Sequence, residues 1–427
     1  MSQTPEKLIL EPTTRCNFKC DMCVKQSQGC EIVEGDLDKE VFSRCESLFP
    51  TVKSVIFTGI GEPLLNDNLE AYISSAKELM PEKSIRGFQT NGKLLTRKRA
   101  ISLFKAGINK ICISVDTIRP GLFDAVRNGG MLSDICQAFE SVNYARKRFP
   151  QTDVKIGIEF VLMKKNMEEL PLLVEWAGER QVDFIIVTHV VAYEKHIEKE
   201  IAFLNNSHEA LILFESFKQK TQIKEINLAQ YYQALLKVNK SKKDIEIYKM
   251  VEGLKKEALK QDLYINFLHI LSEQPGEYDQ IHTVFERAAT IAQKLEIDLV
   301  LPSIRPKTSR ECCFIEEGSM FVSWDGNVSP CYFLWHKYAV MRAGYVKHVT
   351  PVFFGNVLDT SLEDIWNKDD FKKFRTQVKQ YDYPNCHAWC ETRCDYVLDE
   401  PFYQDCYIND IPCCDCHWNL GLLNCLS

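Results

Sequence analysis

The sequence lacks the features that mark membrane and secreted proteins. It has no run of about 18 apolar residues, so no segment is long enough to form a transmembrane helix. Residues 1–14 contain no basic stretch followed by an apolar one, which is the pattern of a secretory signal. We therefore expect a cytoplasmic protein that makes no use of a membrane.

Positive charge is also in short supply. The 52 Lys and Arg residues are outnumbered by 59 Asp and Glu, giving a net charge of −7. Proteins that bind nucleic acids usually carry a basic stripe, so we expect no nucleic-acid partner. Low complexity and disorder are absent too, because 45% hydrophobic and 26% charged residues are typical of packed domains. The 427 residues suffice for two or three such domains.

Cysteine is the residue in excess. Eighteen cysteines in a chain expected in a reducing compartment favour metal binding or redox work over disulfides. Seven fall between Cys16 and Cys136, none between Gln137 and Glu311, and eleven between Cys312 and Cys425. This distribution predicts two metal-bearing regions separated by ordinary fold-forming sequence. Four of the early cysteines are expected only to pack in the interior: Cys30, Cys45, Cys112 and Cys136.

The first 200 residues repeat a β-then-α pattern. Such units in series predict parallel strands, and six of them favour an α/β fold of the partial (βα)6, TIM-like barrel type. Chemistry in such folds lies at the C-terminal ends of the strands. The expected strands are 7–11, 52–58, 85–90, 110–115, 154–162 and 183–187, and the expected helices are 69–79, 98–105, 133–148 and 167–179.

The rest of the chain divides in two. Apolar residues at helical spacing predict a helical insertion over 201–296, either packed within the protein or offered to a partner. Residues 297–302 resemble one more strand, and Asp325-Gly326 predicts a hairpin turn between 320–324 and 327–329. We therefore expect three domains: a barrel at 1–200, the insertion at 201–296, and a cysteine-rich domain at 297–427.

Three cysteines follow directly on the first expected strand. Cys16, Cys20 and Cys23 have the spacing C-x3-C-x2-C and would lie on a loop at the C-terminal mouth of the barrel. Three thiolates can hold three irons of a four-iron cluster and leave the fourth iron open to a ligand. The alternative is a zinc site, which would need a fourth ligand nearby.

This loop resembles that of the radical S-adenosylmethionine (SAM) enzymes. The resemblance implies a partial barrel whose [4Fe-4S] cluster binds SAM and cleaves it reductively to a 5′-deoxyadenosyl radical. Cys16, Cys20 and Cys23 would then be both the cluster ligands and the catalytic residues. The segment from Thr58 to Pro63 is similar to the family's Gly-Gly-Glu-Pro motif, with the first glycine displaced by one position.

The same resemblance implies a set of SAM contacts at the strand ends. Met22 takes the position of an aromatic that packs on adenine, and Arg127 that of a carboxylate-binding arginine. Each has an ordinary structural alternative as a solvated charge, helix cap or packing residue. The full set of expected cofactor-binding residues is Met22, Gly61, Glu62, Asn91, Ser114, Asp116 and Arg127.

The late cysteines resemble the SPASM extension of radical SAM enzymes. Cys313, Gly326 and Cys331 match its opening spacing, although Cys312 cannot be separated from Cys313. The later spacings depart from the family pattern, so one or two auxiliary [4Fe-4S] clusters are expected, with zinc-ribbon sites as the alternative. The expected ligands are Cys313, Cys331, Cys386, Cys390, Cys394, Cys406, Cys413, Cys416 and Cys425.

The SPASM segment is similar to that of a subgroup of metalloenzyme maturases, including those tied to tungsten-cofactor oxidoreductases. We therefore expect an enzyme that modifies a peptide, protein or cofactor precursor, in the maturation of a partner metalloenzyme. Flavodoxin or ferredoxin would supply the electron. One alternative is thioether, epimer or cross-link formation in a small ribosomal peptide, although only 15 residues precede Cys16 to hold a leader-binding domain. A non-catalytic scaffold stabilised by zinc or clusters is the alternative of another class.

Overall fold

A computed structural model of the chain describes residues 3–27, 30–220, 230–342, 345–381, 383, 413 and 416–426. Among these residues, no helix is long and apolar enough to cross a membrane. The expected ligands Cys386, Cys390, Cys394 and Cys406 lie outside the described residues.

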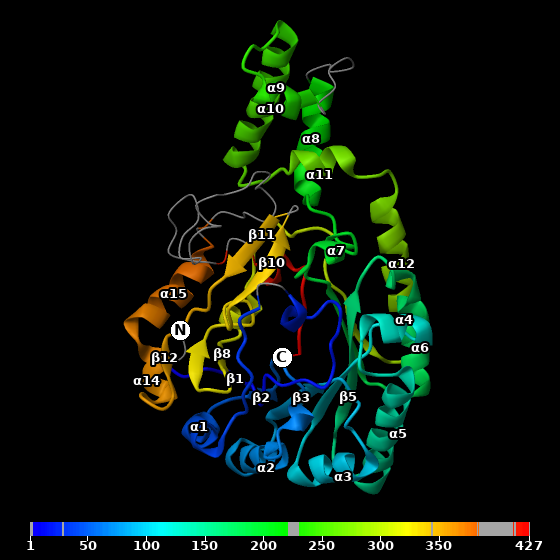
Figure 1. Cartoon of the computed structure of the whole chain (residues 1–427), viewed down its shortest axis with the longest axis vertical. Helices are drawn as coiled ribbons and strands as arrows, with labels where there is room; N and C mark the ends of the chain where they lie inside the picture. Colours follow the sequence, from blue (N-terminus) through cyan, green and yellow to red (C-terminus); the bar gives the residue numbers. More distant parts are fainter. Residues whose placement is uncertain are drawn as a thin grey trace.

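Six parallel strands form the barrel wall in chain order, as predicted. Their interiors are almost entirely apolar and buried, which is what a parallel sheet covered on both faces requires. Helices cover the outside, and the sheet stays open, so the barrel is partial (Figure 1). The strands are β1 (Lys7–Leu10), β2 (Ser54–Phe57), β3 (Ile85–Thr90), β4 (Lys110–Ser114), β5 (Lys155–Leu162) and β6 (Phe184–His189).

Helices follow the strands wherever the sequence offers an apolar stripe and caps. One of them begins at Thr96, whose hydroxyl accepts from the Arg99 amide, and ends at Gly107, whose φ of +99° favours glycine. The barrel helices are α1 (Lys39–Cys45), α2 (Leu69–Leu79), α3 (Arg97–Ala106), α4 (Pro120–Val126), α5 (Leu132–Arg148) and α6 (Leu170–Glu179). Short 3-10 turns are η1 (Val24–Gln26), η2 (Glu46–Leu48), η3 (Pro63–Leu65) and η4 (Met167–Glu169).

Several predicted boundaries were wrong by one or two residues, and one predicted helix is two elements. The sixth strand continues past Val187, because Thr188 and His189 pair with the end of β5. The predicted helix 167–179 is η4 followed by α6, whose second residue is a proline, a residue favoured in the first turn of a helix.

The barrel continues beyond the six predicted units. β7 (Asp298–Val300) pairs in parallel with β6. α12 (Glu277–Lys294) packs on α6, and its stripe of Ile281, Val284, Phe285 and Ala288 joins the barrel core. This helix, which the sequence groups with the insertion, therefore covers the sheet.

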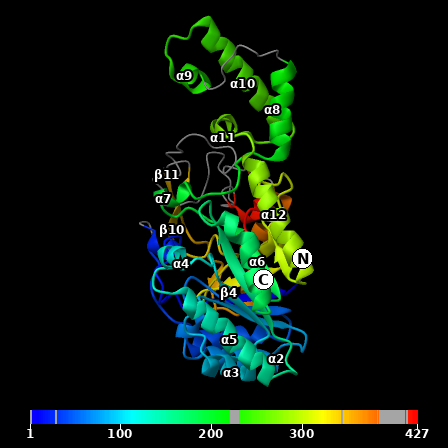
Figure 2. The same cartoon turned by 90° about the vertical axis from the view of Figure 1, so that its right-hand side faces the viewer.

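The remaining insertion helices have a separate core and project from one end of the molecule (Figure 2). Phe214, Val251, Leu254 and Phe267 are among its buried residues. These helices are α8 (His208–Lys220), α9 (Tyr231–Leu236), α10 (Lys242–Lys260) and α11 (Phe267–Ser272). The short α7 (Lys195–Glu198) precedes them, and its Ile197 packs in a different apolar cluster, with Met22 and Met163. The division into three domains stays a prediction.

The predicted hairpin is confirmed, with Gly326 at a φ of +86° in its turn. Its first strand, β8 (Ser319–Val322), pairs in parallel with β1 and so extends the barrel sheet by β9 (Asn327–Ser329) and β12 (Gly355–Asn356). The other elements of this region are α13 (Cys313–Glu316), β10 (Tyr338–Arg342), β11 (Tyr345–Val349), α14 (Leu362–Asn367), α15 (Asp369–Gln380) and η6 (Trp418–Leu420). The cysteine-rich region is thus built onto the barrel's first strand.

Candidate active site

The loop of Cys16, Cys20 and Cys23 leaves the C-terminal end of β1, as predicted. Backbone hydrogen bonds hold it to the segment after α4: the Lys19 amide donates to Asn128 (2.7 Å) and the Asp21 amide to Val126 (3.0 Å). The loop is therefore fixed between the mouth of the barrel and the crossover after β4.

The three thiols are half-buried. Burial raises the pKa of each, that of Cys20 to about 12, while the positive charge of Arg127 acts against this rise. Two N–H groups point at the sulfur of Cys16, from the Phe18 amide at 3.4 Å and the Asn91 side chain at 3.9 Å. Thiols in this setting ionise when a metal binds them, and N–H donors then stabilise the thiolate.

A mononuclear metal site is a separate matter. Among the described residues, no three His, Cys, Asp or Glu side chains lie close enough to hold one metal ion. In a four-iron cluster each cysteine ligates a different iron, so such convergence is not required. The half-buried thiols, and the N–H groups that point at the sulfur of Cys16, fit a cluster bound by Cys16, Cys20 and Cys23.

Gly61 allows the loop after β2 to touch the cysteine loop. The amides of Gly61 and Glu62 donate to the carbonyls of Thr13 (3.2 Å) and Arg15 (2.8 Å). A Cβ at Gly61 would lie 2.3 Å from the Thr13 oxygen and 2.4 Å from that of Arg15. Only glycine permits this approach.

The carboxylate of Glu62 is buried and accepts three hydrogen bonds. The donors are the amide of Leu64 (3.1 Å), the hydroxyl of Thr90 (2.7 Å) and the amide of Asn91 (2.7 Å). Burial raises the pKa of Glu62. Glu62 therefore ties the end of β3 to the loop after β2, and its contact with the SAM ammonium stays a prediction.

Asn91 and Ser114 lie at the ends of neighbouring strands, as predicted. The side chain of Asn91 donates to that of Asn17 in the cysteine loop (2.7 Å), beside the sulfur of Cys16. The hydroxyl of Ser114 accepts from Gln89 (3.3 Å).

Asp116 and Arg127 form a buried ion pair 2.6 Å apart. The second oxygen of Asp116 accepts from the Val161 amide (2.9 Å). Arg127 is buried, and although burial lowers its pKa, the nearby charges of Asp116 and Cys20 raise it overall. The guanidinium of Arg127 is thus held near the cysteine loop, where its positive charge acts on Cys20. The predicted contacts of Asp116 and Arg127 with SAM are untested.

Met22 lies beside Cys20 in a small apolar cluster. The cluster includes Val126, Met163 and Ala192, and Met22 is 8% exposed. Its thioether is placed close to the cysteines, which is compatible with the predicted adenine contact.

Five late cysteines gather in the C-terminal region. Cys312, Cys331 and Cys416 raise one another's pKa through their charges, after the larger effect of burial. The thiols of Cys313 and Cys425 share a hydrogen bond. The charge of Cys313 also raises the pKa of Cys312, Cys331 and Cys416, so the five thiols form one group and Cys312 is not separated from Cys313.

Cys413 lies close to Cys416 of this group, to which a backbone hydrogen bond joins it. The Cys416 amide donates to the Cys413 carbonyl (3.1 Å), and the side chain of Asn419 donates to the same carbonyl (3.4 Å). These contacts place Cys413 next to Cys416, so both remain ligand candidates.

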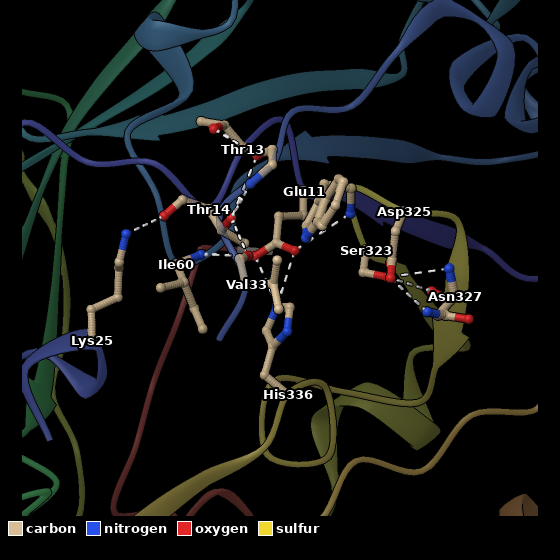
Figure 3. A network of polar contacts seen from close by, with 12 residues as sticks. Glu11, Thr13, Thr14, Lys25, Val33, Ile60, Ser323, Asp325, Asn327 and His336 are labelled. Atoms are coloured by element: carbon tan, nitrogen blue, oxygen red, sulfur yellow. Dashed lines mark hydrogen bonds and ion pairs between the residues drawn. The ribbon is translucent and has the colours of Figure 1, made fainter. Parts of the chain in front are cut away.

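One junction was missed by the sequence. Glu11, at the end of β1, is fully buried and accepts from His336 (3.0 Å to each carboxylate oxygen), from the Ile60 amide (3.1 Å) and from the Trp324 amide (3.4 Å) (Figure 3). This carboxylate joins the first strand, the loop after β2 and the C-terminal region. Its partners are up to 325 residues away, so no local pattern could reveal them.

Glu159 was missed as well. It lies on β5 opposite Ser114, is half-buried and accepts a hydrogen bond from Gln89. Burial raises the pKa of Glu159 to about 7. An acid inside an otherwise apolar strand, Lys155–Leu162, is the signal that could have identified it.

Two family models match the chain. Residues 10–177 match the radical SAM superfamily, and residues 312–395 match SPASM, an iron–sulfur cluster-binding domain. The first match contains the cysteine loop and the strand ends described above, and the second begins at Cys312.

The chain is also similar to curated proteins and to solved structures. The tungsten-containing aldehyde ferredoxin oxidoreductase cofactor-modifying protein of Pyrococcus furiosus is 27% identical over 424 residues, which is 98% of this chain and 96% of that protein. A GTP 3′,8-cyclase of Staphylococcus carnosus is 32% identical over 188 residues, 42% of this chain and 53% of the cyclase. The structure of Streptococcus suis SuiB bound to S-adenosylmethionine is 15% identical, with a TM-score of 0.49, covering 88% of this chain and 68% of SuiB.

The two domains determine which cofactors the chain uses. Its radical SAM domain binds SAM and a [4Fe-4S] cluster, and its SPASM domain binds auxiliary iron–sulfur clusters. The chain belongs to the radical SAM enzymes that carry a SPASM domain.

Proposed function

We propose that this enzyme modifies a cofactor precursor, or a protein that carries one, during maturation of a partner metalloenzyme. The observation that carries the proposal is the similarity to the Pyrococcus furiosus cofactor-modifying protein, which extends over 98% of the chain and includes the helical insertion. A similarity confined to the barrel would not bear on the substrate.

The residues at the barrel mouth would divide the work of binding. Cys16, Cys20 and Cys23 would hold the cluster, which together with SAM supplies a 5′-deoxyadenosyl radical that takes a hydrogen atom from the substrate. Arg127, held by Asp116 at 2.6 Å, would place a positive charge where the SAM carboxylate binds. Gly61 keeps the neighbouring loop close enough for Glu62 and its backbone to meet the SAM ammonium.

The late cysteines would hold the auxiliary clusters. Cys312, Cys331 and Cys416 lie together, and Cys313 lies against Cys425. We therefore propose these five described cysteines as ligands of the auxiliary clusters. A low-potential donor such as flavodoxin or ferredoxin would reduce the first cluster. We place these reactions in the cytoplasm.

The test is a single-turnover assay on anaerobically reconstituted protein. We expect SAM and dithionite to yield 5′-deoxyadenosine, and Cys16→Ala, Cys20→Ala and Cys23→Ala to abolish it. Cys136→Ala is the matched control, because this half-buried thiol lies on α5, away from the cysteine loop. Cleavage that survives the three loop substitutions would place the cluster elsewhere.

A second assay addresses the substrate. Incubation with the unmatured partner metalloenzyme should change the mass of its bound cofactor, while a small ribosomal peptide should stay unmodified. Modification of the peptide alone would replace this proposal with the peptide-modifying alternative.

A further inference from the structure

A cavity of about 380 Å³ lies where the helical insertion, the loop after β6 and the C-terminal region meet. Tyr193 and Tyr338 form part of its wall, with their rings edge to face and 5.8 Å apart. α7 lies beside β10 at this point (Figure 1). The volume is in the range of small-molecule sites.

The cavity shares two wall residues with the apolar cluster that packs beside the cysteine loop. The amide of Met341 donates to the carbonyl of Ala192 (2.7 Å), and both residues line the cavity. Ala192 and Met341 also pack in the apolar cluster that contains Met22 and borders Cys20. A molecule in the cavity would therefore be separated from the cysteine loop by this one apolar cluster.

The wall supplied by the insertion is polar and ordered. Asn266 caps α11 by accepting from the His269 amide (3.1 Å). The amide nitrogen of Asn205 lies 3.0 Å from Nδ1 of His269, so Nδ1 accepts and the ring proton is on Nε2. Burial lowers the pKa of His269 and keeps the ring neutral. The cavity is thus lined by a neutral imidazole in one tautomer.

This wall is anchored to the barrel. Asn206 is fully buried and bonds the backbone of Asn266 in both directions, at 2.7 and 3.1 Å. Arg305, which follows β7, donates to the Asn206 carbonyl (3.1 Å) and pairs with Glu273. α11 is therefore held in place by the segment after β7 as well as by the insertion.

The lining excludes strongly anionic ligands. Among the described residues that line the cavity, Lys164 has the only lysine or arginine side chain, and it pairs with Glu277 at 3.2 Å. Glu198, Glu273 and Glu277 line the same cavity, as do the rings of Phe333 and Trp418. Aromatic faces suit a flat ring, and carboxylate and amide oxygens suit its N–H groups.

We propose that this cavity binds an uncharged, amino-substituted nitrogen heteroaromatic ring. The inference rests on the proposed function, because it makes a cofactor ring, rather than a peptide, the group brought to the radical. It also assigns the insertion a role: α11 supplies the polar wall against which the ring's edge would bind.

Pterin, which is an amino-substituted nitrogen heteroaromatic ring, is the probe. Its fluorescence, titrated anaerobically against reconstituted protein with SAM present, should show saturable binding. His269→Leu should weaken that binding about tenfold, the effect of losing one hydrogen bond. His282→Leu, on the exposed face of α12, is the matched control and should bind pterin as the wild type does. GTP has a similar amino-oxo edge but carries three phosphates, and it should bind at least about tenfold more weakly than pterin.

Hydrogen exchange gives a readout independent of the variant's folding. Pterin should protect α11 and β10 in the wild-type protein. The inference is overturned if pterin does not bind below about 1 mM, if it binds His269→Leu and wild type equally, if GTP binds as tightly, or if protection falls elsewhere. Any of these results obtained while SAM is still cleaved leaves the reaction proposal standing. Absence of 5′-deoxyadenosine overturns that proposal instead.

Discussion

Gly61 is the residue whose local chemistry has the widest effect on the site. Its missing side chain lets two carbonyls of the segment before Cys16 approach within bonding distance of the next loop. The motif was recognised from the sequence, but the reason for the glycine is a contact between two loops that the sequence does not place.

Gly61→Ala tests this contact. A Cβ 2.3 Å from the Thr13 oxygen forces the two loops apart, so we expect iron content and 5′-deoxyadenosine formation to fall at least about tenfold. Gly121→Ala is the matched control, since a Cβ there meets nothing within 4 Å. Full iron content in Gly61→Ala would contradict the role given to this contact.

Glu159 makes a prediction about pH at the same scale. Its pKa is raised to about 7 in the folded protein, because burial disfavours the charged form. A raised pKa means that the unfolded chain releases this proton first, so stability from this group is full below about pH 4 and is lost as the pH rises through 7. Glu159→Gln should therefore remove a pH-dependent loss of roughly 1–3 kcal/mol between pH 5 and 8.

Urea unfolding of both proteins at pH 5 and pH 8 measures this difference. The exposed Glu175→Gln on α6 is the control and should track the wild type at both values. An unchanged pH dependence in Glu159→Gln would show that the carboxyl is already charged in the folded protein at pH 5.

At the scale of elements, α12 and the other insertion helices belong to different cores. The apolar spacing of Leu254 in α10 and of Val284 in α12 is the same kind of signal, and both segments were correctly predicted to be helical. Spacing reveals an apolar face but not what covers it. Only the pairing of β7 with β6 brings α12 back to the barrel.

Leu254→Ala should therefore act locally. Removing this buried side chain costs about 2–5 kcal/mol in the small insertion core, so hydrogen exchange should speed up in α8 to α10 and stay unchanged in α12. Val284→Ala is the counterpart, and should speed exchange in α12 and α6 while leaving α10 unaffected. Equal effects of both variants on all these helices would mean that the two cores unfold together.

At the scale of the whole molecule, a buried contact between Glu11 and His336 helps to join the two iron–sulfur regions. Glu11 is fully buried at the end of β1 and meets His336 of the C-terminal region, while Ile60 donates to the same carboxylate. β8 adds to the same strand from the other side. The barrel and the SPASM region are thus joined both by a shared sheet and by the buried carboxylate of Glu11.

His336→Ala should destabilise the whole chain. The lost partner leaves the buried carboxylate of Glu11 without its hydrogen bonds from His336, a change of about 1–3 kcal/mol in the free energy of unfolding. Lys337→Ala removes the neighbouring exposed pair with Glu31 and should cost less than about 1 kcal/mol. Chemical unfolding of both variants gives the comparison, and equal losses would refute the special role of Glu11.

The sequence by itself determined the chemistry and the repeating elements. Cys16, Cys20 and Cys23 after a strand, the strand ends from Gly61 to Arg127, and the Asp325-Gly326 turn are local patterns, because a few neighbouring residues set their spacing and backbone shape. Only the tertiary structure decided what meets across the chain: the pairing of β8 with β1, the place of α12, and the junction at Glu11. These contacts join residues that are far apart in sequence, and their free energy comes from burial and charge in the folded state, which no local spacing encodes.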